Sequence, residues 1–273
     1  MPSDLFALAR DNAPRLADQC QETIDSKTGD DLPTIEAFAA LVDEDARVGV
    51  NMRPSVLALI LGGESYLNMN ELAEKDSQSG SIGYEQALRK RLGQWYDRRV
   101  TFEAEFERGT EFKYLAVNVG TAGALRYQGV CAILKHEALT IVELLPSDSL
   151  QRYVNGSDVD TDRVEAEVGS WDSRCHVAVI KLDGRACRCS PAEWRRLVCS
   201  GDDFIEVICV DSFGADEVSH VRITESEEAR LRQAVYNTYT GGDPTTNREA
   251  HALIEVKGDL RSRGMTLEVV ADA

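Results

Sequence analysis

The sequence predicts an α+β protein, with a helical N-terminal region at residues 1–46 and one mixed-sheet domain at residues 47–273. Three observations support this interpretation. Apolar residues recur at helical spacing before residue 46. After residue 47, short β-branched and aliphatic runs dominate, with few helices between them. No repeat and no low-complexity linker divides the chain, so we expect the helices to pack on the sheet.

The composition limits the classes of partner. Hydrophobic residues make up 43% and charged residues 28%, which is typical of a folded globular protein. A net charge of −17 repels phosphate backbones, so no nucleic-acid partner is expected. The apolar run at residues 56–61 is too short to span a bilayer, and the N-terminus lacks an export signal. We expect a cytoplasmic protein without a membrane partner, or one that leaves its cell by a route independent of signal peptides.

The seven cysteines predict reduced thiols and not a metal centre. Structural zinc sites usually combine two closely spaced cysteine pairs. Only one such pair, Cys187 and Cys189, is present. No metal site is therefore predicted.

Helical spacing from Leu5 to Ile24 predicts a first helix, with Pro14 as a kink or break. A turn at residues 27–31 precedes a second helix that runs to about residue 46. A short strand then begins at residue 47 and ends before Pro54. Residues 62–83 are rich in Gly, Ser, Asn and Glu and predict a long loop.

The rest of the chain predicts mainly strands. They are expected at residues 113–119, 130–135, 175–182, 204–210 and 218–223. Capping boxes predict two helices, at residues 191–197 and from 224 to about 239. Residues 251–256 and 265–270 are expected to form a closing hairpin.

Two segments carry polar groups suited to a nucleotide ligand. Arg98 and Arg99 lie between acidic and aromatic residues, and an arginine can hold a phosphate with two parallel hydrogen bonds. The alternative is a solvated charged face. Residues 147–149 (SDS) could bond a ribose, although serine and aspartate equally favour a simple turn.

A third segment places Glu255 and Lys257 two residues apart on a predicted strand, so that both point to one face. Such a pair, with Asp243 upstream, could hold Mg²⁺ in a nuclease. A strand glutamate could instead stabilise a developing oxocarbenium ion in glycosyl transfer. The third alternative is an exposed salt bridge on an edge strand.

Six short motifs occur in a fixed order over roughly residues 47–271. They are residues 50–54 (VNMRP), 99–103 (RVTFE), 113–118 (KYLAVN), 124–137 (ALRYQGVCAILKHE), 147–149 (SDS) and 254–258 (IEVKG). In this order they resemble a bacterial domain family that includes effector-type ADP-ribosyltransferases. Arg53, Ser147 and Lys257 stand where that family has other residues.

The resemblance implies an ADP-ribosyltransferase-like split mixed β-sheet core and a mono-ADP-ribosyltransferase that uses NAD as substrate. The acceptor would be a protein, and some members of the group modify ubiquitin on threonine. The site residues implied are Arg99, or its neighbour Arg98, for NAD binding, Ser149 for the ribose pocket, Tyr114 and Asn118 for the nicotinamide side, and Glu255 as the catalytic glutamate. No metal is implied.

Two other functions remain open on the sequence. One is a Mg²⁺-dependent nuclease that uses Asp243, Glu255 and Lys257. The other is a non-catalytic interaction module that keeps the same fold. Both would leave NAD unconsumed.

Overall fold

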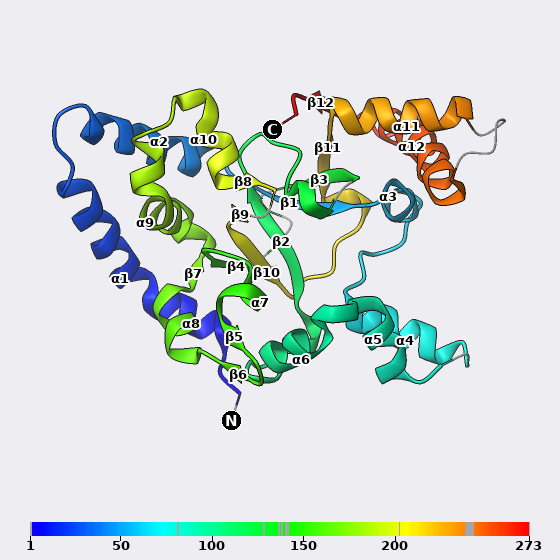
Figure 1. Cartoon of the computed structure of the whole chain (residues 1–273), viewed down its shortest axis with the longest axis horizontal. Coiled ribbons are helices and arrows are strands. Elements are labelled where there is room, and N and C mark those ends of the chain that lie inside the picture. Colours follow the sequence, from blue (N-terminus) through cyan, green and yellow to red (C-terminus); the bar gives the residue numbers. More distant parts are fainter. Residues whose placement is uncertain are drawn as a thin grey trace.

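The computed structural model describes residues 2–80, 82–127, 129–135, 137, 139, 142–201, 203–237 and 243–272. Within these residues a mixed β-sheet stands between groups of helices (Figure 1). The helices are α1 (Leu5–Asp25), α2 (Asp31–Asp45), α3 (Pro54–Leu61), α4 (Met69–Gln78), α5 (Tyr84–Leu92), α6 (Tyr96–Ala104), α7 (Ser149–Arg152), α8 (Thr161–Glu167), α9 (Arg174–Ala186), α10 (Pro191–Val198), α11 (Glu225–Asn237) and α12 (Pro244–Ser262). The strands are β1 (Arg47–Met52), β2 (Lys113–Asn118), β3 (Val130–Leu134), β4 (Val142–Leu145), β5 (Val154–Asn155), β6 (Asp158–Val159), β7 (Gly169–Ser170), β8 (Cys199–Ser200), β9 (Asp203–Phe204), β10 (Glu206–Cys209), β11 (Val218–Thr224) and β12 (Leu267–Val270).

The described strands of the main sheet follow the order β12-β11-β3-β1-β2-β10-β4-β7. Among these described strands, β11 and β12 pair in parallel and the other neighbours pair antiparallel. Two short hairpins, β5–β6 and β8–β9, lie outside this sheet. The predicted α+β class and the mixed sheet are confirmed.

The two faces of the sheet differ in character. Side chains alternate between the faces along a strand, so Leu115 and Val117 point away from Tyr114 and Ala116. The first pair belongs to the main hydrophobic core, which also includes buried residues of α2, α3, α9, α11 and α12. On the opposite face Glu206 stands next to Ala116 in the register of β10 and β2. Polar groups therefore gather on this second face.

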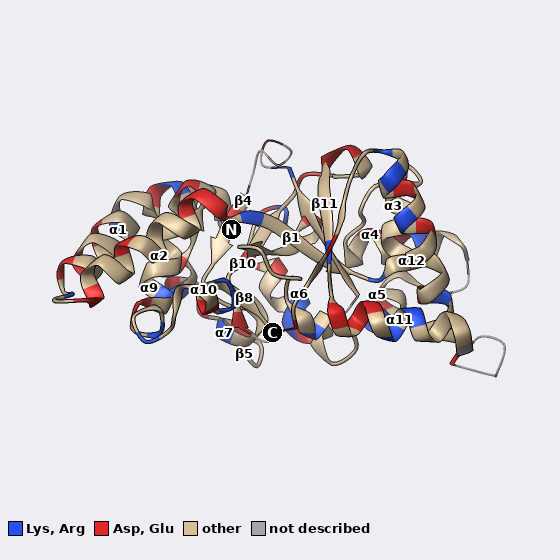
Figure 2. Ribbon diagram, turned by 90° about the horizontal axis from the view of Figure 1, so that it is seen from above, with Lys and Arg blue, Asp and Glu red and all other residues tan. Residues whose placement is uncertain are grey.

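The N-terminal helices α1 and α2 are confirmed, and Pro14 lies inside α1 without ending it. They extend to one side of the sheet and pack beside α9 (Figure 2). The ring of Phe38 in α2 meets Trp194 of α10 edge to face, with 5.7 Å between the centroids. Leu16 of α1 also belongs to the main core. The helical region thus shares its core with the sheet.

The loop predicted at residues 62–83 was wrong, because this segment contains α4. Asn68 begins the helix with a reciprocal capping box, in which its side chain and that of Glu71 bond each other's backbone N–H groups. Ala73 then packs against Ala87 and Leu88 of α5 in a small separate cluster. The polar composition here reflects the exposed face of a helical hairpin.

The strand predicted at residues 175–182 was also wrong, since these residues lie in α9. Val177, Ala178 and Leu182 are buried in the main core. Their positions fit one face of a helix, and α10 follows behind its predicted capping box at Ser190. A short aliphatic run alone cannot distinguish a buried helix from a strand.

The predicted closing hairpin was wrong in its first half, because residues 251–256 lie within α12. Asp243 caps this helix by accepting a hydrogen bond from the Thr246 N–H at 2.7 Å, and Pro244 occupies the first turn. Leu253 and Val256 face the core at helical spacing. β12 is a strand as predicted, but it pairs with β11. No helix in the described part of the chain is long and apolar enough to cross a membrane.

Candidate functional site

A cavity of about 180 Å³ lies on the second face of the sheet, between β1, β2, β10 and α6. Its walls combine aromatic rings with a few polar groups, and Tyr66, Tyr114 and Tyr127 are among the rings. An apolar cavity of roughly 150 Å³ can hold a benzene ring. This cavity therefore has room for one aromatic ring with a small substituent.

Arg99 brings a positive charge to the wall of the cavity. Its guanidinium carbon lies 3.4 Å from the centroid of the Tyr114 ring, and its Nη1 is 3.9 Å from Oε1 of Glu103. Nε and Nη1 are buried and make no hydrogen bond to any described residue. Buried donors of this kind normally find a partner, so this guanidinium is suited to an anionic ligand.

Burial acts against the charge on Arg99, but its neighbours preserve it. Desolvation alone would lower the pKa of the guanidinium. Tyr114, Glu103 and Glu206 outweigh that effect and raise the pKa above its usual value. Arg99 is therefore a permanent cation at the wall of the cavity.

Glu206 provides the negative charge deepest in the site. It is the first residue of β10, only 4% exposed, and it lies between β2 and β4 in the sheet. Burial and the nearby Asp148 raise the pKa of its carboxyl to about 7, against the opposing effect of Arg99. This carboxyl group can exchange a proton near neutral pH.

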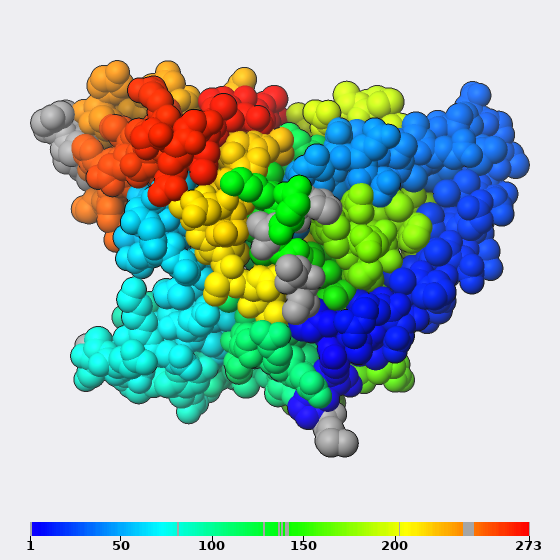
Figure 3. All heavy atoms as spheres, turned by 180° about the vertical axis from the view of Figure 1, so that it is seen from behind, coloured from blue at the N-terminus to red at the C-terminus, as the bar shows by residue number. Residues whose placement is uncertain are grey.

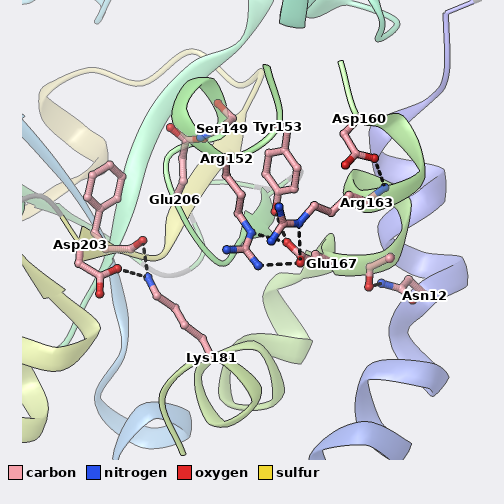
Figure 4. A network of polar contacts seen from close by, with 12 residues as sticks. Asn12, Ser149, Arg152, Tyr153, Asp160, Arg163, Glu167, Lys181, Asp203 and Glu206 are labelled. Carbon is pink, nitrogen blue, oxygen red and sulfur yellow. Dashed lines mark hydrogen bonds and ion pairs between the residues drawn. The ribbon is translucent and has the colours of Figure 1, made fainter. Parts of the chain in front are cut away.

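Ser149 approaches Glu206 from α7. Its backbone N–H donates to Oε2 of Glu206 at 3.0 Å, and the two residues lie side by side in Figure 4. The Oγ of Ser149 is buried and has no hydrogen-bond partner among the described residues. Asp148 caps α7 by accepting hydrogen bonds from the backbone N–H groups of Leu150 and Gln151. A hydroxyl is thereby held beside the carboxylate.

A cluster of polar side chains next to α7 holds this short helix in position (Figure 4). Glu167 of α8 accepts two bonds from Arg152, each at 2.6 Å, and one from the Tyr153 hydroxyl at 2.7 Å. Arg163 donates a further bond to the same carboxylate at 3.2 Å. Tyr153 is buried. The position of Ser149 therefore depends on a rigid support.

The structure brings together three of the residues singled out in the sequence. Arg99 and Tyr114 line the cavity, and Ser149 bonds Glu206, which lines it too. The neighbour Arg98 instead donates to the carbonyl oxygen of Leu150 at 3.2 Å. Of the two adjacent arginines, Arg99 is the one in the cavity.

Asn118 lies on the same sheet face as Tyr114, but its side chain stabilises the turn that follows β2. Its side-chain oxygen accepts bonds from the N–H groups of Gly120 and Thr121 at 2.9 and 3.0 Å, and from Arg222 at 3.1 Å. Its amide nitrogen donates to the Thr121 carbonyl at 2.9 Å. The polar atoms of Asn118 are therefore engaged within the protein.

Glu255 does not join the other site residues. It lies on α12, a helix and not the strand we predicted, and its side chain is exposed. α12 packs on α3 and α11. Seen from behind, α11 and α12 occupy one corner of the molecule and α4 and α5 another (Figure 3). The helix period explains the exposure, because Leu253 and Val256 take the buried side.

The three nuclease candidates do not form a cluster. Asp243 caps the start of α12, and Glu255 follows twelve residues later, roughly 18 Å along the helix axis at 1.5 Å per residue. Lys257 donates to Glu228 at 2.7 Å. Among the described residues no group of His, Cys, Asp and Glu could hold a metal ion.

Sequence reasoning missed Glu206, although a signal was present. The strand predicted at residues 204–210 contains one carboxylate among aliphatic residues. The same argument was applied to Glu255, whose segment is helical. A carboxylate on a strand that is buried is a better indicator of a functional site than one on a segment that proves to be an exposed helix face.

Comparison with known proteins does not assign the chain to a class. No protein-family model matches the sequence. A search of curated proteins also finds no match.

Proposed function

We propose that this protein is an NAD-dependent ADP-ribosyltransferase that modifies a protein acceptor, with Glu206 as the catalytic glutamate in place of Glu255. One observation carries the proposal. Arg99 and Glu206 come from distant segments and line one ring-sized cavity, and Ser149, from a third segment, donates its backbone N–H to Glu206. The resemblance implies an arginine that binds NAD, a serine in the ribose pocket and a catalytic glutamate. We also propose that the main sheet is an ADP-ribosyltransferase-like core.

The groups present fit the nicotinamide end of NAD. The cavity has room for one substituted ring, which suits nicotinamide. Arg99 carries two buried donors that could bond a phosphate oxygen. The Oγ of Ser149 is buried beside Glu206 without a hydrogen-bond partner among the described residues, and in this proposal it would bond a ribose hydroxyl. Adenosine would extend outside the cavity, because the cavity is too small for a whole dinucleotide.

The reaction needs negative charge where positive charge develops. The bond between the ribose and the nicotinamide nitrogen breaks, and nicotinamide leaves with the electron pair. The sugar then carries oxocarbenium character, which an ionised Glu206 would stabilise at close range. The acceptor atom forms the new bond to the ribose and releases its proton. No metal is required for these steps.

A matched pair of variants tests the proposal. The purified protein is incubated with NAD and ubiquitin, and separately with NAD and a eukaryotic lysate, and intact protein masses are read. We expect an added ADP-ribose on an acceptor that disappears in Glu206→Gln and persists in Glu255→Gln. Loss of the adduct in Glu255→Gln alone would overturn the assignment of Glu206. An absence of both adduct and NAD consumption in the parent protein would overturn the function.

Calorimetry with NAD separates this proposal from a non-catalytic interaction module. An enzyme of this kind binds NAD at the cavity, and Arg99→Ala should weaken that binding. A module that keeps only the fold should release no heat with NAD.

A further inference from the structure

A second carboxylate, Glu103, lies beside the cavity and takes no part in the chemistry proposed above. It is 6% exposed and stands four residues after Arg99 on α6, so that both side chains occupy one face of the helix. Burial raises the pKa of its carboxyl, while Arg99, Asn70 and Tyr114 oppose that rise. A group this costly to bury needs a reason for its position.

Both oxygens of Glu103 are bonded to the protein. Oε2 accepts a hydrogen bond from the Asn70 amide at 3.0 Å, and Oε1 accepts one from the Tyr114 hydroxyl at 3.2 Å. Oε1 also lies 3.9 Å from Nη1 of Arg99. Burial raises the pKa of Tyr114 well above its usual value, so its hydroxyl remains a donor. These contacts leave Glu103 poorly placed to take a proton from a substrate.

The chain of contacts continues into the helical hairpin α4–α5. Asn70 belongs to α4, and its side-chain oxygen accepts a hydrogen bond from the Tyr84 hydroxyl of α5 at 2.6 Å. The hairpin has its own small apolar cluster around Ala73 and Leu88. A continuous polar chain thus runs from this hairpin through Glu103 to the Tyr114 ring on which Arg99 stacks.

We infer that Glu103 is a positioning residue, which holds the Arg99 guanidinium against the Tyr114 ring with its unpaired donors toward the ligand. Asn70 and Tyr84 fix Glu103 in turn, so the α4–α5 hairpin determines how well the site binds an anion. The inference rests on the proposed function for the identity of the ligand. The arrangement of the side chains is independent of it.

The variant Glu103→Gln removes the charge and keeps the shape. Its amide nitrogen would face either the Asn70 amide or the Tyr114 hydroxyl, both of which are donors. The double variant Glu103→Gln/Asn70→Asp restores a donor and an acceptor between positions 103 and 70 but moves the negative charge away from position 103. Glu107→Gln, an exposed change just beyond α6, is the matched control.

Two measurements separate positioning from a purely structural role. The first is the Nε–Hε resonance of Arg99 in the ligand-free protein, observed by NMR. The second is KM and kcat for NAD, with the melting temperature recorded for each variant. In Glu103→Gln we expect the Arg99 resonance to shift and KM to rise roughly tenfold, because Arg99 loses the carboxylate that lies 3.9 Å from its Nη1. We expect kcat to change much less.

The double variant should regain thermal stability and keep the raised KM. If it restores KM together with stability, or if folded Glu103→Gln keeps both the Arg99 resonance and KM, the inference is wrong. If Glu103→Gln alone does not fold, the double variant decides by the same criteria. A parent protein that neither binds nor consumes NAD would refute the proposed function, and the Arg99 resonance would then decide the role of Glu103.

Discussion

Ionisation of Glu206 should act on activity and on stability in opposite directions. In the proposed reaction, the ionised carboxylate is the form that would stabilise positive charge on the sugar. With a pKa of about 7, roughly one tenth of the carboxyl groups are ionised at pH 6. The rate of NAD consumption at pH 6 should therefore be about a tenth of the rate above pH 8.

The stability of the fold should change the other way. Burial raises the pKa of Glu206 from 4.5 to about 7 in the folded protein. The folded chain therefore holds a proton that the unfolded chain loses between these two pH values. The contribution to stability is complete below about pH 4.5 and is lost as the pH rises through 7. At 1.36 kcal/mol per pH unit, the loss amounts to about 3 kcal/mol.

Glu206→Gln separates the two effects, because glutamine stays neutral. We expect this variant to be inactive, and to exceed the parent in free energy of unfolding by about 3 kcal/mol at pH 8 but hardly at pH 4.5. Urea unfolding at both pH values and a pH–rate profile provide the assay, with exposed Glu255→Gln as control. A flat rate between pH 6 and 8, or parallel stability curves for parent and variant, would refute the reasoning.

Two further predictions concern other buried polar groups. Glu143 is 4% exposed with Oε2 unbonded among the described residues, and burial raises its pKa to about 9. The stability that this raised pKa contributes is lost as the pH rises from 4.5 toward 9. Glu143→Gln should therefore exceed the parent in free energy of unfolding at pH 9 by several kcal/mol. Equal free energies of unfolding in urea at pH 9 would contradict this. Asn118→Ala should lose roughly 3 kcal/mol, because four hydrogen bonds are removed. NAD calorimetry on its folded form should give an unchanged Kd, whereas a weakened Kd would place Asn118 in the binding site.

Local signals predicted much of the fold. The sequence patterns at Ser190 and Thr224 predicted α10 and α11, because such patterns stabilise a helix start. Ser190 forms the full capping box, and the Oγ1 of Thr224 accepts a hydrogen bond from the Glu227 N–H at 3.2 Å. The strands β1, β2, β3 and β11 were predicted correctly because each is a short β-branched or aliphatic run. α9 and α12 were missed, because their short aliphatic runs fit either a buried helix or a strand. The cap formed by Asp243 and Pro244 was the signal that could have corrected α12.

The site was predictable only in part. Arg99, Tyr114 and Ser149 were singled out because each lies in a short recognisable motif. The sequence indicates Glu206 as a carboxylate on a predicted strand, but it does not indicate that this strand is a central one in the sheet. That depends on β10 pairing with β2 and β4, which is a contact between distant segments. Such pairing leaves no local pattern in the sequence.

The placement of β10 has a consequence for how the protein acquires activity. β10 enters the sheet between β2 and β4, both of which precede it in the chain. Pairing between distant segments forms slowly, because long loops must close first. Glu206 reaches Ser149 and the cavity only once this strand is in place. Under the proposed function, a chain in which β10 is unpaired would lack activity, and activity should return during refolding only together with this pairing.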